Sequence, residues 1–483
     1  MQCITIFINA LANQISQLNN RMQKLLCIYF KAKSLPKSVY HLFYRCGIVK
    51  SYRWSVEALR NISDAAMAKA VQVFEQQPCL IIHDNIRLPF AVKHQRGDHL
   101  TTTDNGTAIT MMPLRDPIRA KQLLWNPELW EEHKLKIAGM YRENTMRHFS
   151  AQDLFALPGF LCERDRTISN ILNFLFETPL VAKSKKLEKS QKRHHHLLAE
   201  IQPVHQLLYG PSHCNQQYML QSIPQEEASY GGNYAITKEA PHQLGLDTDE
   251  AKEKWARGQK VPWIGDSLTI QRQRGLQLMK CEDTSPLERL EHIIPIFGWF
   301  HLDMNLVNGI FYHHYAEDSN SGLARDAAAL RRSGLTKPTK KRGPPYHTGD
   351  EFLRHTTTAR MRELWLWATE SKDEVTLVRW VENSTPEQIQ AIAEKIWSQR
   401  ASNRAIETFK DKDASLCNTI ALTRDLLLRH EVWTSIRQGD VGRMENTLPA
   451  LLVFFLGAGA NNYAKEIAEV LHWRQFEAPP GVA

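Results

Sequence analysis

The chain has 483 residues, a net charge of +8, 43% hydrophobic residues and 12 tryptophans. This length allows two or three domains with cores of their own, and the composition excludes a disordered or fibrous chain. The mild positive charge favours an anionic partner, although ordinary solvated surface charge explains it nearly as well. The eight cysteines form no CxxC pair, which argues against a zinc ribbon or a disulfide framework and indicates a reducing compartment.

Residues 1–76 are predicted to form an N-terminal helical region. The apolar start has no basic leader and no cleavage site, so we expect an amphipathic helix reaching Lys31 and not a signal peptide. No apolar run approaches the twenty residues of a membrane span. Two helices around a turn at Gly47 resemble a helix-turn-helix, with Lys50, Arg53 and Arg60 on or near the second helix. A helix pair that does not enter a DNA groove is the alternative.

Residues 77–117 are predicted to begin a sheet. The run CLIIHDNI is apolar and β-branched and ends near Asp84, which is typical of a buried strand that delivers a carboxylate to its end. An Asx-turn at Asp84 is the alternative. The alternating residues that follow predict a β-hairpin around the sequence Asp-Asn-Gly at Asp104 to Gly106.

Residues 261–315 are predicted to complete the sheet. The short run VPWI reads as a strand that places Asp266 at its carboxyl end, where α/β sheets put their chemistry. Arg272 and Arg274 follow within two helical turns. A carboxylate near guanidinium groups suits a site for metal ions and phosphate, whereas the alternative is that Asp266 only caps the helix.

The rest of this segment predicts further elements. A short helix is expected at Pro286–Ile294, a second strand at Pro295–Phe300 and a helix from His301 to Tyr315. His301 either contacts DNA or is a hydrogen-bonded core histidine. The order strand, Asp, helix, strand, aromatic-His, helix is similar to the central catalytic segment of RNase-H-like transposases.

Three further blocks complete the chain. Residues 118–260 are interpreted as a helical and basic insertion that includes the basic run Lys183–Leu198. Residues 316–438 are a second helical insertion with a basic linker at Lys337–His347. Residues 439–483 are closing helices that complete the core, and Glu466 and Glu469 lie three positions apart on the last one.

Five motifs carry a resemblance to a known family: HDNI, NGTAIT, GDSLTIQRQRGL, FGWFHLDMNLVNGIF and NNYAKEIAEVL. The chain resembles a fungal family of unknown function with Gly-Asp-Gln-Leu-Thr and Phe-Gly-Trp-Phe-His motifs, from about Ser16 onward. Ser267 stands where that family usually has Gln. The chain opens inside what resembles the family's helical leader. The layout is similar to RNase-H-like DNA transposases of the mutator and hAT kind.

This resemblance implies an α/β fold with large helical additions, in which helical insertions interrupt an RNase-H-like mixed sheet. It implies Mg²⁺- or Mn²⁺-dependent DNA cleavage and strand transfer by an Asp-Asp-Glu triad of Asp84, Asp266 and Glu466, with Glu469 as the alternative to Glu466. Arg272, Arg274 and His301 would contact DNA. The alternative is a catalytically inactive DNA- or protein-binding scaffold. We expect a nuclear protein with DNA as its partner, with a homo-oligomer possible and no membrane partner.

Overall fold

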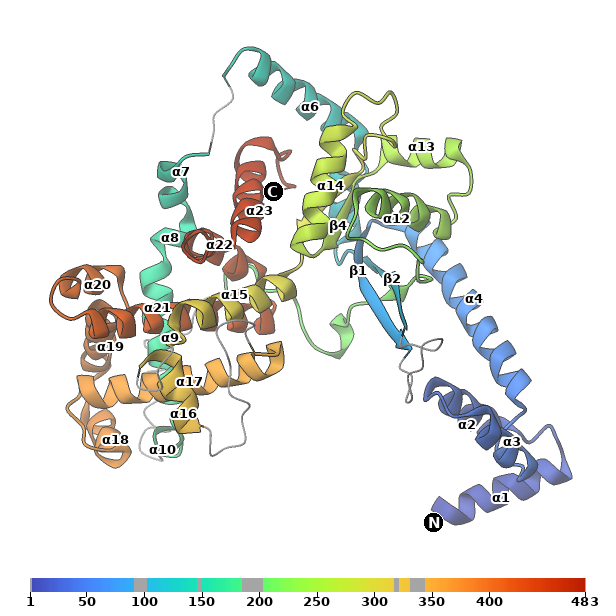
Figure 1. The fold of residues 1–483 in the computed structure, drawn as a ribbon, viewed down its shortest axis with the longest axis horizontal. Helices are drawn as coiled ribbons and strands as arrows, with labels where there is room; N and C mark the ends of the chain where they lie inside the picture. Colours follow the sequence, from blue (N-terminus) through green and yellow to red (C-terminus); the bar gives the residue numbers. More distant parts are fainter. Residues whose placement is uncertain are drawn as a thin grey trace. The chain divides into compact units, whose positions relative to one another are not determined.

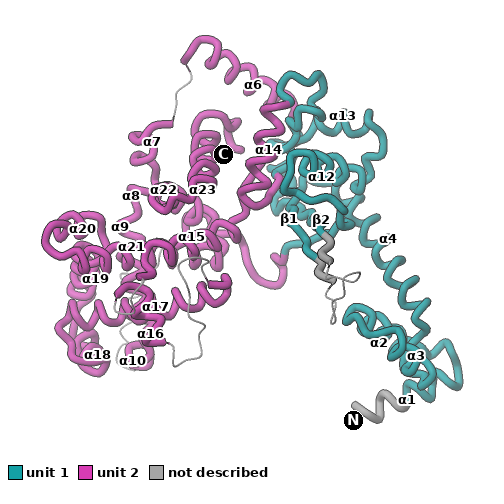
Figure 2. Tube along the Cα trace, in the orientation of Figure 1, with its two compact units in different colours: residues 1–125, 215–262, 280–293 teal, residues 126–214, 263–279, 294–483 magenta. Residues whose placement is uncertain are grey.

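The computed structural model describes residues 2–90, 102–145, 149–184, 203–316, 321–330 and 344–482. The chain is an α/β protein with a large helical content and one small mixed sheet, whose strand order is β3-β2-β1-β4-β5. The α/β fold class is therefore confirmed at this level. The chain divides into two compact units, which Figure 2 distinguishes by colour.

The first unit comprises residues 1–125, 215–262 and 280–293. Its elements are α1 (Gln2–Ile15), α2 (Arg21–Ala32), α3 (Lys37–Arg45), α4 (Tyr52–Gln76), β1 (Cys79–Phe90), β2 (Thr102–Pro113), α5 (Pro117–Leu124), β3 (Tyr218–Met219), α12 (Tyr230–Gln243) and α13 (Asp249–Gly258). The strands β4 (Val261–Gly265) and β5 (Ile293–Phe297) each begin within it.

The second unit comprises residues 126–214, 263–279 and 294–483. Its helices are α6 (Pro127–Arg142), α7 (Ala151–Ala156), α8 (Pro158–Leu161), α9 (Glu163–Phe176), α10 (Pro179–Ala182), α14 (Ser267–Met279), α15 (Trp299–His314), α16 (Gly322–Leu330), α17 (Tyr346–Ala368), α18 (Glu374–Asn383), α19 (Pro386–Arg400), α20 (Asn403–Phe409), α21 (Ala414–Gln438), α22 (Val441–Gly457) and α23 (Asn461–His472). Short helical turns η1 (Pro211–His213) and η3 (Trp473–Glu477) complete it.

The strands β1 and β2 form a long antiparallel ribbon. Two sequence predictions for this region, a strand end at Asp84 and a turn at Asp104–Gly106, are wrong. Asp84 does not end a strand, because β1 continues to Phe90 and Asp84 pairs with Ala108. The predicted turn at Asp104–Gly106 is also wrong, since these residues lie inside β2 opposite β1. Continuous pairing with a neighbouring strand keeps the Asp-Asn-Gly sequence extended. The connection between the two strands falls on residues 91–101, outside the described part.

The N-terminal helices pack around a small core of their own. Cys27, Tyr40 and Val49 are buried there, and aromatic and aliphatic side chains of α2, α3 and α4 surround them. Gly47 adopts φ +71° in the turn between α3 and α4, a conformation that glycine accepts without strain. The two helices predicted in residues 35–62 are confirmed, but α1 and α2 are separate helices where one was expected.

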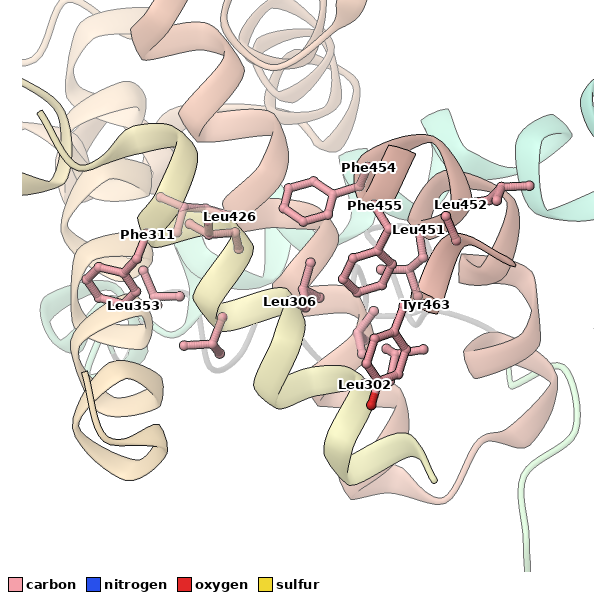
Figure 3. Packing of buried hydrophobic residues seen from close by; sticks show 14 of the residues in the cluster. Leu302, Leu306, Phe311, Leu353, Leu426, Leu451, Leu452, Phe454, Phe455 and Tyr463 are labelled. Carbon is pink, nitrogen blue, oxygen red and sulfur yellow. The ribbon is translucent and has the colours of Figure 1, made fainter. Parts of the chain in front are cut away.

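The second unit contains a core of aliphatic and aromatic side chains from α15, α17, α21, α22 and α23. Figure 3 shows Leu302 and Leu306 of α15 facing Phe455 and Tyr463 from the closing helices. In Figure 1, the long helices α15 and α21 belong to this part of the chain. They pack against each other. A second cluster, which includes Trp365 and Ile396, joins α17 and α19 to α9.

The helical predictions for the C-terminal half are largely confirmed. The helix α19 begins at Pro386, as expected, because Thr385 and Gln388 form a capping box. The helix predicted at Pro286–Ile294 is wrong: these residues form turns and then enter β5, and Leu290 has φ +55°. Most of the basic run Lys183–Leu198 and of the linker Lys337–His347 lies outside the described residues. Within the described residues, no helix has both the length and the hydropathy needed to cross a bilayer.

Candidate functional site

Asp266 lies at the junction between β4 and α14, as the sequence predicts. Its Oδ1 accepts a hydrogen bond of 2.7 Å from the backbone N–H of Thr269, so the carboxylate caps α14. Gly265 permits the tight turn, because a Cβ there would lie 2.5 Å from the side chain of Thr269. The carbonyl of Gly265 accepts from the N–H of Gly298 at 2.8 Å, which ties this junction to the start of α15.

Tyr463 of α23 completes a polar cluster at this junction. Burial raises the pKa of the Tyr463 phenol to about 12, and the Asp266 carboxylate contributes to the rise. Hydrogen bonds with Ser267 and Asn305 act in the opposite direction. One helix start, one carboxylate and three neutral polar side chains therefore meet in the second unit. This set can donate and accept hydrogen bonds, and Tyr463 stays protonated at neutral pH.

Glu466, one turn further along α23, is held by Arg274. Its side chain is 0% exposed, and Arg274 Nε lies 3.0 Å from its Oε2. Arg274 also donates to the carbonyl of Pro295 at 3.3 Å, so it connects α14, β5 and α23. Burial raises the pKa of Glu466 and the Arg274 guanidinium opposes this rise. Two residues predicted for metal and DNA binding are thus partners in one buried ion pair.

The other predicted site residues lie as follows. Asp84 is exposed on β1, on the side opposite buried Ile81 and His83. Arg272 is half-buried on α14. His301 is half-buried in the first turn of α15, where its ring lies 5.5 Å from that of Phe300. Glu469 is half-buried on α23.

Asp266 and Glu466 do not fit a two-metal site as they lie. Asp266 uses one oxygen as a helix cap, and Glu466 faces Arg274. Across the described ranges, no group of three or more His, Cys, Asp or Glu side chains is placed to hold a metal ion. A pair of divalent cations needs several free carboxylate oxygens around one space. No metal-dependent step follows from this arrangement.

A second candidate surface lies on the N-terminal helices. The first 62 residues hold nine lysines and arginines and a single acidic residue, Glu57, which leaves 51 basic and 51 acidic residues in the rest of the chain. The whole net charge of +8 therefore belongs to this segment. Seven of the nine side chains are exposed: Arg21, Lys24, Lys33, Lys37, Arg45, Arg53 and Arg60.

Aromatic side chains lie among these basic groups. Lys31 Nζ donates to the Tyr52 hydroxyl at 2.6 Å and lies 4.2 Å from the ring centroid, with Lys37 Nζ at 5.7 Å from the same ring. Tyr29 and Tyr44 are about half exposed. Positive charges interleaved with aromatic rings are typical of surfaces that contact nucleic-acid backbones and bases.

Sequence reasoning found only part of these two sites. The helix-turn-helix pattern indicates Lys50, Arg53 and Arg60, but the net charge of the whole chain does not show where the charge lies. Counting charge by segment would have revealed the concentration before Ile62. It also missed Tyr463, whose place beside Ser267 depends on contacts between distant segments.

These features define an α/β protein with a basic helical N-terminus and a polar cluster at the β4–α14 junction. Residues 145–483 match DUF6589, a family of unknown function, and the chain belongs to that family. The match begins later than the Ser16 expected from the motifs. No curated protein and no solved structure matches the chain.

Proposed function

We propose that this chain is a transposase-derived nuclear protein that binds DNA through its N-terminal helices and does not cut it. The observation that carries the proposal is the confinement of the entire net charge to the first 62 residues. Phosphate neutralisation by lysine and arginine supplies most of the affinity of proteins for DNA. A segment with nine such residues and one carboxylate attracts DNA far more strongly than the same charge diluted over 483 residues.

The order of elements supports an RNase-H-like origin. A strand with Asp84 is followed by an antiparallel partner, then by β4 with Asp266 and a helix, then by β5 with a helix carrying the Trp-Phe-His sequence. The closing helix α23 carries Glu466 after a long helical block. This is the layout that the resemblance to RNase-H-like transposases implies.

The ion pair of Glu466 with Arg274 supports binding without cleavage. A carboxylate that is buried and engaged by a guanidinium at 3.0 Å is a poor ligand for a cation, because the pair would have to separate first. In this proposal, Arg274 serves the fold and not a DNA phosphate.

Replacing Lys24, Lys37, Arg45 and Arg60 together by Gln tests the binding surface. These four exposed side chains lie on α2, α3 and α4. We expect affinity for a short DNA duplex to fall about 100-fold at 0.1 M salt. The slope of log K against log salt should become less steep by about 3–4, at roughly 0.9 for each lost phosphate contact. Fluorescence anisotropy over a salt series measures both quantities.

A matched control removes the same charge from the second unit. Arg379, Arg404, Lys410 and Lys412 are exposed there, and their replacement by Gln also takes the net charge from +8 to +4. This control is expected to stay within about threefold of the parent chain. Equal losses in the two quadruple variants, or none in the first, would refute the proposed surface.

Metal-dependent strand cleavage is the second candidate function. It is favoured by the exposure of Asp84 and by the place of Asp266 directly after β4. It requires that Glu466 leave Arg274 or that half-buried Glu469 act in its place.

The variant Asp266→Asn separates this candidate from the first. Asn caps helices as well as Asp does, so we expect the fold to be unchanged. If the chain cuts DNA, the substitution should abolish nicking of supercoiled plasmid in Mg²⁺ or Mn²⁺. Nicking at equal rates by the parent and the variant would exclude Asp266 as a catalytic residue, and no nicking by either supports the first candidate.

A further inference from the structure

A cavity of about 820 Å³ lies among the helices of the second unit. It is lined by residues of α8, α9, α15, α16, α17, α20, α21 and α22, together with Arg400 at the end of α19. Asp266, Glu466 and Tyr463 do not line it, so it is separate from the polar cluster at the β4–α14 junction. Its volume lies within the range of small-molecule sites.

Four arginines line this cavity, and they differ in how their charge is balanced. Arg360 pairs with Asp326 at 2.9 Å and Arg424 with Asp425 at 2.7 Å. Neither Arg400 nor Arg325 has a carboxylate within ion-pair distance among the residues that the structure describes. Within the described residues, the cavity therefore holds two guanidinium groups that form no ion pair.

Arg400 is the more unusual of the two. Its guanidinium lies 4.2 Å from the ring centroid of Trp367, and its hydrogen bond goes to the carbonyl of Gln399 at 3.0 Å. Burial lowers the pKa of Arg400. Its side chain is half-buried, and a bound anionic group would offset what this partial burial costs the charge. Its planar donors match the oxygens of a phosphate.

The remaining lining fits the other parts of a nucleotide. Phe160, Phe454 and Trp367 supply apolar surface to the lining, here called the apolar wall, and Asn403 contributes an amide. Glu163 lines the cavity as well, and burial raises the pKa of its carboxyl. A carboxyl group there can accept hydrogen bonds from hydroxyl or amino donors of a ligand. Guanidinium groups, apolar side chains and a hydrogen-bond acceptor thus line one cavity.

We propose that this cavity binds a nucleoside phosphate, with the phosphate on Arg400 and Arg325 and the base against the apolar wall. Two ligands would present this same nucleotide to the cavity: a free nucleoside monophosphate and the phosphorylated end of a DNA strand. The site is independent of the DNA-binding surface on the N-terminal helices.

Titration of the full chain with a fluorescent derivative of adenosine monophosphate tests this assignment. We expect saturable binding, at least tenfold weaker binding for Arg400→Gln, and a similar loss for Arg325→Gln, whose exposed side chain can change without unfolding the protein. Arg437→Gln is the matched control, because Arg437 lies 4.9 Å from the ring of Trp433 outside the cavity, and it should bind within twofold of the parent.

Competition experiments identify the source of the nucleotide. Displacement of the probe by unlabelled adenosine monophosphate supports a free nucleotide, and stronger displacement by a 5′-phosphorylated oligonucleotide supports a DNA end. The proposal is overturned if the parent chain shows no saturable binding up to about 1 mM probe, or if both cavity variants bind as the parent does.

Discussion

Replacing Arg443 by Met is expected to lower the free energy of unfolding of the second unit by about 3–5 kcal/mol. Arg443 is 2% exposed and binds Glu431 through two hydrogen bonds, Nε to Oε1 at 2.9 Å and Nη2 to Oε2 at 2.7 Å. Asn170 also donates to Glu431 at 2.8 Å. The substitution leaves the buried Glu431 carboxylate without its two hydrogen bonds from Arg443, and Arg166, whose Nε lies 3.8 Å from Oε1, remains as a more distant counter-charge. This loss costs more than the loss of one surface pair.

Hydrogen exchange of backbone amides in α9 and α21 measures this loss, because these helices carry Asn170 and Glu431. Arg474→Met is the control: Arg474 pairs with Glu445 at 3.0 Å, but both side chains are about one-third exposed. A pair of that kind contributes less than about 1 kcal/mol. Similar changes in the two variants would contradict the structural role assigned to Arg443.

Replacing Arg274 by Met is expected to destabilise the second unit by about 3 kcal/mol at pH 7 and by less at pH 5. Glu466 is 0% exposed, and in the variant no guanidinium lies beside its carboxylate to offset the burial of its charge. Burial already raises the pKa of Glu466 above its ordinary value near 4.5, and loss of Arg274 raises it further.

The sign of the pH effect follows from proton binding. Between the unfolded pKa near 4.5 and the raised folded pKa, the folded state holds more protons than the unfolded state. The stability that protonated Glu466 contributes is therefore present at low pH. It is lost as the pH rises through the pKa of Glu466 in the folded state. Acidification should recover part of what Arg274→Met loses.

Hydrogen exchange of α14 and α23 at pH 5 and pH 7, corrected for the intrinsic exchange rate, measures this dependence. The double variant Arg274→Met with Glu466→Gln removes the titrating group, so its stability should change less with pH than that of the single variant. A single variant that is equally destabilised at the two pH values would show that Glu466 is not the group left uncompensated.

Local sequence patterns were sufficient for the β4–α14 junction. The run VPWI followed by Gly265 and Asp266 predicts the strand, the turn and the start of the helix correctly. Each of these features depends only on residues that are close in the sequence. The same holds for α19, where Thr385 and Pro386 set the first turn.

Features that depend on distant partners were not predictable in this way. The extended backbone at Asp104–Gly106 is set by pairing with β1, although its sequence favours a turn. The position of Arg274 near Asp266 predicts a phosphate contact, but the structure pairs Arg274 with Glu466, which lies 192 residues away. Local sequence pattern and residue spacing do not reveal an ion pair between such distant residues. The short separation of Arg274 from Asp266 therefore indicates a ligand site that the structure does not form.

The separation between Arg274 and Glu466 also has a consequence for biosynthesis. While the ribosome is still adding the residues before Asn461, α14 has no α23 to pack on, and Leu302 and Leu306 lack Tyr463. Such a partly made chain exposes apolar surface for the time needed to translate the intervening helices. The second unit should therefore depend on chaperones during synthesis, and messages truncated before α23 should yield products that aggregate or are degraded.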